Sequence, residues 1–109
     1  MTVEHMVAKC GFDPISLPDP SREICGVYIG DLLSWVMGRA SEGNAWITIM
    51  SNINVIAVAS LTDVSCVILA EGVTLEDDVL VKAEEKQINI IHSSLPAYET
   101  ALKIRECLI

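Results

Sequence analysis

The sequence WITIMSNINVIAVASLTDVSCVILAEG, residues 46–72, is the most informative part of this chain for its fold. Its only carboxylates are Asp63 and, near its end, Glu71. Such a scarcity of charge admits three interpretations, namely a membrane span, a β-hairpin, or a strand, helix and strand buried together. A bilayer span needs about twenty nearly uninterrupted apolar residues. Polar residues within 51–54 and 62–65 cut this run into three pieces, so it is not expected to cross a membrane.

The remaining choice lies between the hairpin and the strand-helix-strand unit. A hairpin would pair AWITIM (45–50) with VIAVAS (55–60), and the β-branched content permits this pairing. However, NVIAVASL (54–61) is apolar on successive residues with small side chains between them, which is typical of a helix packed tightly against a sheet. SCVILA (65–70) then forms the next buried strand. We favour the strand-helix-strand unit.

Upstream of this stretch, the sequence continues the alternation of strands and helices. CGVYIGD (25–31) predicts a strand, and DLLSWVMGRA (31–40) predicts a helix whose free amides Asp31 could cap. Apolar residues at helical spacing predict a short amphipathic helix over 3–10. The prolines of 14–18 indicate a loop or an edge strand.

Downstream, three further elements are predicted. Thr74 precedes Asp77 in the manner of a capping box and begins a helix over 74–87. INIIHS (88–93) predicts a strand, and residues 94–109 predict a final helix with a stripe formed by Tyr98, Ala101, Leu102 and Arg105. Strands that alternate with helices favour parallel pairing through crossovers. We predict a three-layer α/β sandwich with a mostly parallel central sheet of about four to five strands and helices on both faces.

Composition limits the class of protein. The 109 residues, 51% of them hydrophobic, are enough for a single domain over 1–109. A formal charge of −8 repels nucleic acid and acidic membranes, so neither is an expected partner. The first residues, MTVEHMVAKC, carry no targeting signal, and we expect a cytoplasmic protein.

No metal or cofactor is predicted. Cys10, Cys25, Cys66 and Cys107 are far apart in the sequence and form no CxxC pair, so we interpret them as reduced and mostly buried. The acidic run at 76–78 complements a helix dipole more simply than it chelates a cation. No glycine-rich phosphate loop is present in the sequence.

The candidate ligand site lies where predicted strands end. In parallel α/β sheets, ligands collect at the carboxyl ends of strands, where helix amides are free. Ser51 and Asn52 stand at such a junction and could either cap a helix or bind a small anion or another ligand. We therefore name Ser51, Asn52, Asn54, Gly72 and His92 as tentative ligand-binding residues, and we name no catalytic residue.

Residues 26–104 resemble the DRTGG domain family. The most specific phrases are GDLLSWVM (30–37), AWIT (45–48), AVASLTDVSCVILAEG (57–72) and INIIHS (88–93). This family includes short stand-alone bacterial proteins. In other proteins the domain is joined to CBS domains or precedes the catalytic part of some phosphotransacetylases. Its fold resembles the N-terminal domain of HPr kinase/phosphorylase.

The resemblance implies a self-associating three-layer α/β domain with a regulatory role. The Asp-Arg pair of longer members corresponds here to Asn52 and Ile53, and their Thr-Gly-Gly element corresponds to Ala70, Glu71 and Gly72. An arginine-dependent anion site is therefore not implied for this chain.

Three hypotheses about function follow. The first is a non-catalytic regulatory or protein-interaction module, homodimeric, that binds a small molecule or nucleotide at the strand ends. The second is a small enzyme that uses His92 or Ser93 near a strand end. The third is a subunit that docks on a kinase or redox enzyme through an apolar face around Trp35 and Met37.

Overall fold

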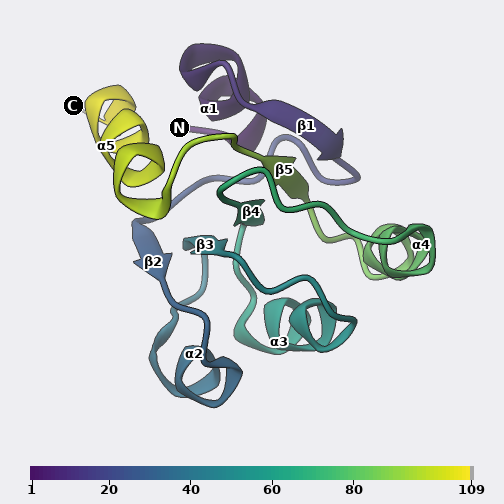
Figure 1. Cartoon of the computed structure of the whole chain (residues 1–109). Coiled ribbons are helices and arrows are strands. Elements are labelled where there is room, and N and C mark those ends of the chain that lie inside the picture. The colour runs from purple at the N-terminus through teal and green to yellow at the C-terminus, as the bar shows by residue number, and fades with distance from the viewer. Residues whose placement is uncertain (109) are drawn as a thin grey trace.

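The computed structural model describes residues 1–108, which form a five-stranded sheet with helices on both faces (Figure 1). The strand order is β1-β5-β4-β3-β2, and only β1 runs antiparallel to its neighbour. This arrangement confirms the predicted α/β class and its mostly parallel sheet. Along the chain the elements are α1 (Val3–Cys10), β1 (Asp13–Ser16), β2 (Val27–Ile29), α2 (Leu33–Arg39), β3 (Ala45–Thr48), α3 (Asn54–Thr62), β4 (Cys66–Leu69), α4 (Asp77–Glu85), β5 (Ile90–His92) and α5 (Ala97–Leu108).

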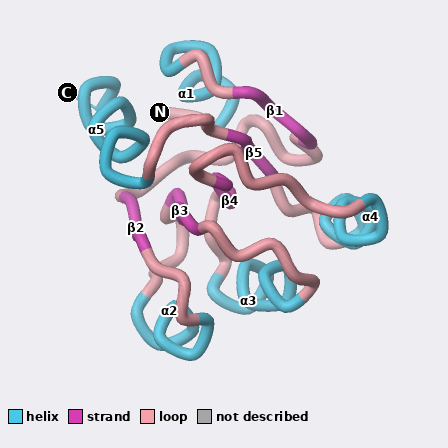
Figure 2. Tube along the Cα trace, viewed as in Figure 1, coloured by secondary structure: helices cyan, strands magenta, loops and turns pink. Residues whose placement is uncertain are grey.

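The helices divide between two layers because of the strand order. Strands β2 to β5 are neighbours in sequence order, and crossovers of one hand carry every connecting helix to the same face. Helices α2, α3 and α4 therefore cover one face, while α1 and α5 pack together on the other (Figure 1). Figure 2 shows a loop between each of the parallel strands β2, β3, β4 and β5 and the helix that follows it.

The stretch 46–72 forms the centre of the molecule. It contains β3, α3 and β4, which confirms the strand-helix-strand interpretation. All four residues of both strands are buried, and alternate side chains enter opposite apolar clusters. Trp46 joins the cluster under α2, α3 and α4, whereas Ile47 joins the cluster under α1 and α5. Helix α3 is buried on one side only, and Leu61 is exposed on the other.

Two predicted helix starts are wrong. Helix α2 begins at Leu33, and the Asp31 carboxylate accepts hydrogen bonds from Thr48 Oγ1 at 2.8 Å and from the backbone N of Ile49 at 3.0 Å. Asp31 therefore ties β2 to the end of β3 instead of capping α2. Helix α4 begins at Asp77 after an irregular segment, and Thr74 does not cap it. A capping pattern in the sequence does not show which hydrogen-bond partners the tertiary structure brings to the capping residue.

The N-terminal segment agrees with its prediction. Helix α1 spans the predicted residues, and its cap Thr2 accepts a hydrogen bond from the backbone N of His5 at 3.2 Å. The proline-containing segment supplies β1, an edge strand that pairs antiparallel with β5. Among the helices of residues 1–108, none combines the length and apolar character needed to cross a bilayer.

The final helix, α5, has one side in the core and another that lines the surface. The stripe containing Tyr98, Leu102 and Arg105 does not face the core, and Tyr98 is 67% exposed. Thr100 and Ile104 are buried instead, against α1 and the sheet. The stripe predicted from helical spacing lines a groove on the surface.

Candidate interaction face and ligand pockets

The carboxyl ends of the four parallel strands lie along one edge of the sheet, and hydrogen bonds connect the loops that follow them. The backbone N of Gly72, after β4, donates to the Ser93 carbonyl after β5 at 3.0 Å. The Asp31 bonds described above join the loops after β2 and β3. Each of the five tentative ligand residues belongs to this edge, but no single pocket contains them all.

Ser51 and Asn52 line a pocket of about 360 Å³ between α3 and α4, here called the α3–α4 pocket. Its other walls include Glu76 and Asp78 at the start of α4. Two carboxylates beside the junction oppose an anionic ligand, so the anion considered from the sequence does not suit this pocket. Asn54 is exposed, and its backbone N donates to the Asn52 side chain at 2.9 Å. Asn52 thus supports the first turn of α3, as one of the sequence interpretations expected.

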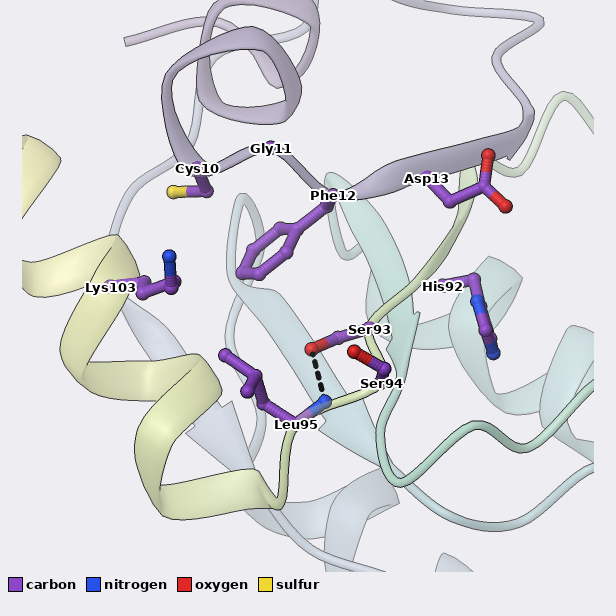
Figure 3. A pocket seen from close by; sticks show the side chains of 9 residues that line it. All are labelled: Cys10, Gly11, Phe12, Asp13, His92, Ser93, Ser94, Leu95 and Lys103. Carbon is purple, nitrogen blue, oxygen red and sulfur yellow. Dashed lines mark hydrogen bonds between the residues drawn. The ribbon is translucent and has the colours of Figure 1, made fainter.

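His92 contributes to a second pocket, of about 240 Å³, at the end of β5, here called the β5 pocket (Figure 3). Lys103 from α5, Asp13 from β1 and Cys10 from α1 complete much of its lining. Figure 3 shows the His92 ring turned away from Cys10 and Lys103. The pocket combines one cationic and one anionic side chain, and Gly72 lies outside it.

His92 and Ser93 do not form a catalytic pair. Successive residues at the end of a strand point to opposite faces of the sheet. Ser93 accordingly meets Thr100 of α5, with 2.8 Å between their hydroxyl oxygens, and accepts a hydrogen bond from the backbone N of Leu95 at 3.2 Å. His92 Nε2 is buried and has no hydrogen-bond partner among the described residues. This geometry gives no support to a histidine-activated serine.

The cysteines differ in their surroundings. All four are free, with Cys10 and Cys66 buried, Cys107 half-buried and Cys25 exposed. The prediction of free cysteines is confirmed, whereas Cys25 departs from the expected burial. Complete burial raises the pKa of the Cys66 thiol to about 12. Within residues 1–108 no group of three or more His, Cys, Asp or Glu side chains is arranged to hold a metal ion.

Two hollows flank β2, which lies at an edge of the sheet formed by residues 1–108 and has β3 as its one strand partner there. Between β2 and α5 lies a groove of about 500 Å³ that Tyr98 and Leu102 help to line, here called the α5 groove. On the opposite face of β2 lies a groove of about 420 Å³ with Leu32 and Trp35, here called the α2 groove. Tyr28 and Ile29 contribute to both grooves.

The exposed side chains of this region form one surface. Ile29, Leu32, Trp35, Tyr98 and Leu102 are large, apolar or aromatic, and exposed, and we call them the interaction face. Trp35 is 55% exposed, and the guanidinium carbon of Arg39 lies 4.1 Å from the centre of its ring. Sequence reasoning proposed an apolar face around Trp35 but did not extend it to Tyr98 and Leu102. That β2 lies at an edge of the sheet formed by residues 1–108 could not be seen from sequence.

Comparison with known protein families identifies a family that matches most of this chain. Residues 24–107 match the DRTGG domain. The chain belongs to the DRTGG domain family. The match begins just before β2 and ends within α5, so it contains β2, β3, β4 and β5 and all three helices on one face of the sheet. Helix α1 and strand β1 of this DRTGG domain precede the matched region.

A solved structure has the same fold. It is the crystal structure of the CBS and DRTGG domains of the regulatory region of Clostridium perfringens pyrophosphatase, in complex with the activator diadenosine tetraphosphate. The TM-score is 0.74 at 15% sequence identity, and the alignment covers 94% of this chain and 45% of that chain. At this identity the likeness concerns the fold. No curated protein matches the sequence significantly.

Proposed function

We propose that this DRTGG domain is a non-catalytic regulatory module that forms a homodimer through the interaction face. The observation that carries the proposal is an unpartnered edge strand with an apolar groove on each side. An exposed strand edge offers unpaired backbone groups to a second chain, and flanking apolar side chains add area that association removes from water. In the pyrophosphatase neighbour, the DRTGG domain is part of a regulatory region, which supports the regulatory part of the proposal.

The occupant we propose is a second copy, and the charge of the chain bears on this choice. A formal charge of −8 makes two copies repel each other at long range. Arg39 and Arg105 lie at the two grooves, where their charge reduces this repulsion locally. Two β2 edges related by a two-fold axis would pair antiparallel and bring the same apolar side chains together.

Size-exclusion chromatography with light scattering tests the dimer. We expect a dimer whose dissociation constant decreases with added salt, because salt screens the repulsion between the two chains. Ile29→Lys, at a side chain that is 49% exposed, should raise the dissociation constant at least about tenfold by burying an unpaired charge. Val81→Lys on α4 is the matched control, since Val81 is 55% exposed and lies outside both grooves. A strict monomer at high concentration would refute the dimer, and this face would then be open to a different protein, such as a kinase or redox enzyme.

The ligand part of the proposal concerns the carboxyl edge of the sheet. We propose that a small molecule or nucleotide binds there, with Ser51, Asn52, Asn54, Gly72 and His92 as the candidate contacts. The β5 pocket offers Lys103 to an anionic group of phosphate size, with Asp13 opposing it, whereas the α3–α4 pocket offers only the carboxylates of Glu76 and Asp78 as charged groups and suits a neutral or basic ligand. The nucleotide in the pyrophosphatase complex supports a search among nucleotides first.

A thermal-shift series with adenine nucleotides and small phosphorylated metabolites tests the ligand. A ligand at a hundred times its dissociation constant stabilises the folded state by about 2.7 kcal/mol. Lys103→Gln should abolish the shift if the ligand occupies the β5 pocket, and Asn52→Ala should abolish it if the ligand occupies the α3–α4 pocket. If none of these compounds moves the melting temperature, this ligand class is rejected.

We also propose that residues 1–109 act as a single domain in the cytoplasm. Helix α1 and strand β1 support the first part, because they pack into the same core and sheet as the family region. The free cysteines fit a reducing compartment. Limited proteolysis of the purified protein should leave α1 attached; early loss of residues before β2 would contradict a single domain.

A further inference from the structure

Two thiols from the first and last helices face each other. Cys10 is the final residue of α1, and Cys107 lies in the last turn of α5. Their sulfur atoms are 3.3 Å apart, although 97 positions separate the two residues in the sequence. No local motif joins them, and only the packing of α1 against α5 brings them together (Figure 1).

The helices that carry the two thiols are firmly packed. Val7 of α1 and Ile104 of α5 belong to the same buried cluster, and Ala101 and Cys107 pack against it. Cys10 is buried while Cys107 is half-buried, so solvent reaches one sulfur more easily than the other. A disulfide requires sulfur atoms about 2.05 Å apart. To form the bond, the two sulfur atoms therefore have to move closer together by little more than about 1 Å.

We propose that Cys10 and Cys107 form a reversible intramolecular disulfide when the protein meets an oxidised low-molecular-weight thiol, and that this bond fastens α5 to α1. The proposal is independent of the function proposed above. It assigns the pair as a redox modification site, in contrast to Cys66, which is fully buried. Transient, redox-sensing disulfides are the kind found in reducing compartments.

The chemistry consists of two exchanges. The more accessible Cys107 thiolate attacks one sulfur of the small disulfide, which forms a mixed disulfide and releases one small thiolate that takes a proton from water. Cys10 then attacks Cys107 Sγ, and its proton passes to the second departing thiol. Two protein thiols lose two protons and two electrons in total. The small disulfide gains them and becomes two small thiols.

The surroundings of Cys10 set the order of these steps. Burial, followed by the neighbouring Cys107 thiol, raises the pKa of Cys10 to about 12, so Cys10 is a protonated thiol at neutral pH. Lys103 opposes this rise, while Glu106 adds to it. A protonated, shielded thiol is a poor nucleophile, so Cys10 does not begin the exchange. Its short distance to Cys107 Sγ, 3.3 Å, favours its attack in the second step, where it loses its proton as it attacks.

Oxidised glutathione is the probe that tests this inference. The experiment uses the full chain with Cys25→Ser, because Cys25 is exposed and would form its own adduct. After incubation we expect an intact mass lower by two hydrogens and a tryptic peptide that links Cys10 to Cys107, both reversed by dithiothreitol. Closing a loop of nearly the whole chain should raise the melting temperature by about 5 °C or more.

Two variants separate the two steps. In the same background, Cys10→Ser should stop at the mixed disulfide and retain one glutathione on Cys107. Cys107→Ser should retain none on Cys10. A folded protein that forms no Cys10–Cys107 peptide at any glutathione ratio would overturn the inference, as would a link through Cys66 or between two chains. If the Cys10–Cys107 disulfide forms but leaves the melting temperature unchanged, it does not fasten α5 to α1, and that part of the inference is wrong.

Discussion

The centre of the sheet and its β2 edge are both rich in apolar side chains, but only the centre is covered. Strands β3 and β4 have a strand on each side and helices above and below, and each contributes four buried residues. Strand β2 has a partner on one side only, and the grooves beside it leave Trp35 and Tyr98 exposed. Apolar content alone therefore does not separate a core from a surface for association.

The two tryptophans show most clearly how the centre of the sheet differs from its β2 edge. Trp46 lies in β3, has no exposed surface and donates its Nε1 hydrogen to the Gly30 carbonyl at 2.9 Å. Trp35 lies in α2, more than half exposed, with Arg39 over its ring. One side chain stabilises the fold and the other is available for contact with a partner.

The largest expected effect is the loss of Trp46. Trp46→Ala should lower the free energy of unfolding by about 3–5 kcal/mol, because it removes a fully buried aromatic ring and leaves a cavity. Urea denaturation followed by circular dichroism measures this change. A loss below about 1 kcal/mol would show that the centre is not as tightly packed as we describe.

A smaller effect is expected for Asp31, which connects the edge strand to the centre. Asp31→Ala should lower the free energy of unfolding by about 1–2 kcal/mol, because the buried Thr48 hydroxyl and the Ile49 amide lose their acceptor. Glu42→Ala at an exposed turn should change it by less than about 0.5 kcal/mol. Equal effects for the two variants would contradict the structural role of Asp31.

The buried thiol of Cys66 predicts a loss of stability at alkaline pH. The pKa of Cys66 is about 12 in the folded state against an ordinary value of 9.0. Between these values the unfolded chain has lost the proton that the folded chain keeps, so stability is full below pH 9 and decreases as pH rises. The slope is roughly 1 kcal/mol per pH unit.

Comparison of variants isolates the contribution of Cys66 from those of other groups that titrate at high pH. Cys66→Ala should have a shallower decrease in unfolding free energy between pH 9 and pH 11 than the wild type. Cys25→Ala, at an exposed position, should keep the wild-type decrease. The same slope in all three proteins would show that the Cys66 thiol does not retain its proton.

A smaller effect on stability than that of Trp46 or Asp31 is expected for Trp35. Trp35→Ala should lower the free energy of unfolding by less than about 1 kcal/mol, because the side chain is 55% exposed and its ring stacks on Arg39 at the surface. The same variant should raise the dissociation constant of the proposed dimer about tenfold or more, as expected for an aromatic anchor. If Trp35→Ala unfolded the domain or left the dissociation constant of the dimer unchanged, Trp35 would not differ from Trp46 in the way described.

Local patterns predicted most of the secondary structure. Polar interruptions in residues 46–72 excluded a membrane span, and the alternation of β-branched runs with helical spacing predicted the parallel sheet and its two helical layers. These signals are local, because helix and strand periodicities repeat within a few residues. The resemblance to the DRTGG family rested on the same stretches, and the match over 24–107 confirms it.

Tertiary structure alone decided which polar groups and apolar stripes meet. Asp31 binds the end of β3 rather than its own helix, and Ser93 meets Thr100 rather than His92. The stripe of Tyr98 and Leu102 faces a groove because α5 packs into the core through other residues, Thr100 and Ile104. The contact between Cys10 and Cys107 crosses nearly the whole chain. Such contacts depend on the relative placement of distant elements, and no periodicity within one segment encodes that placement.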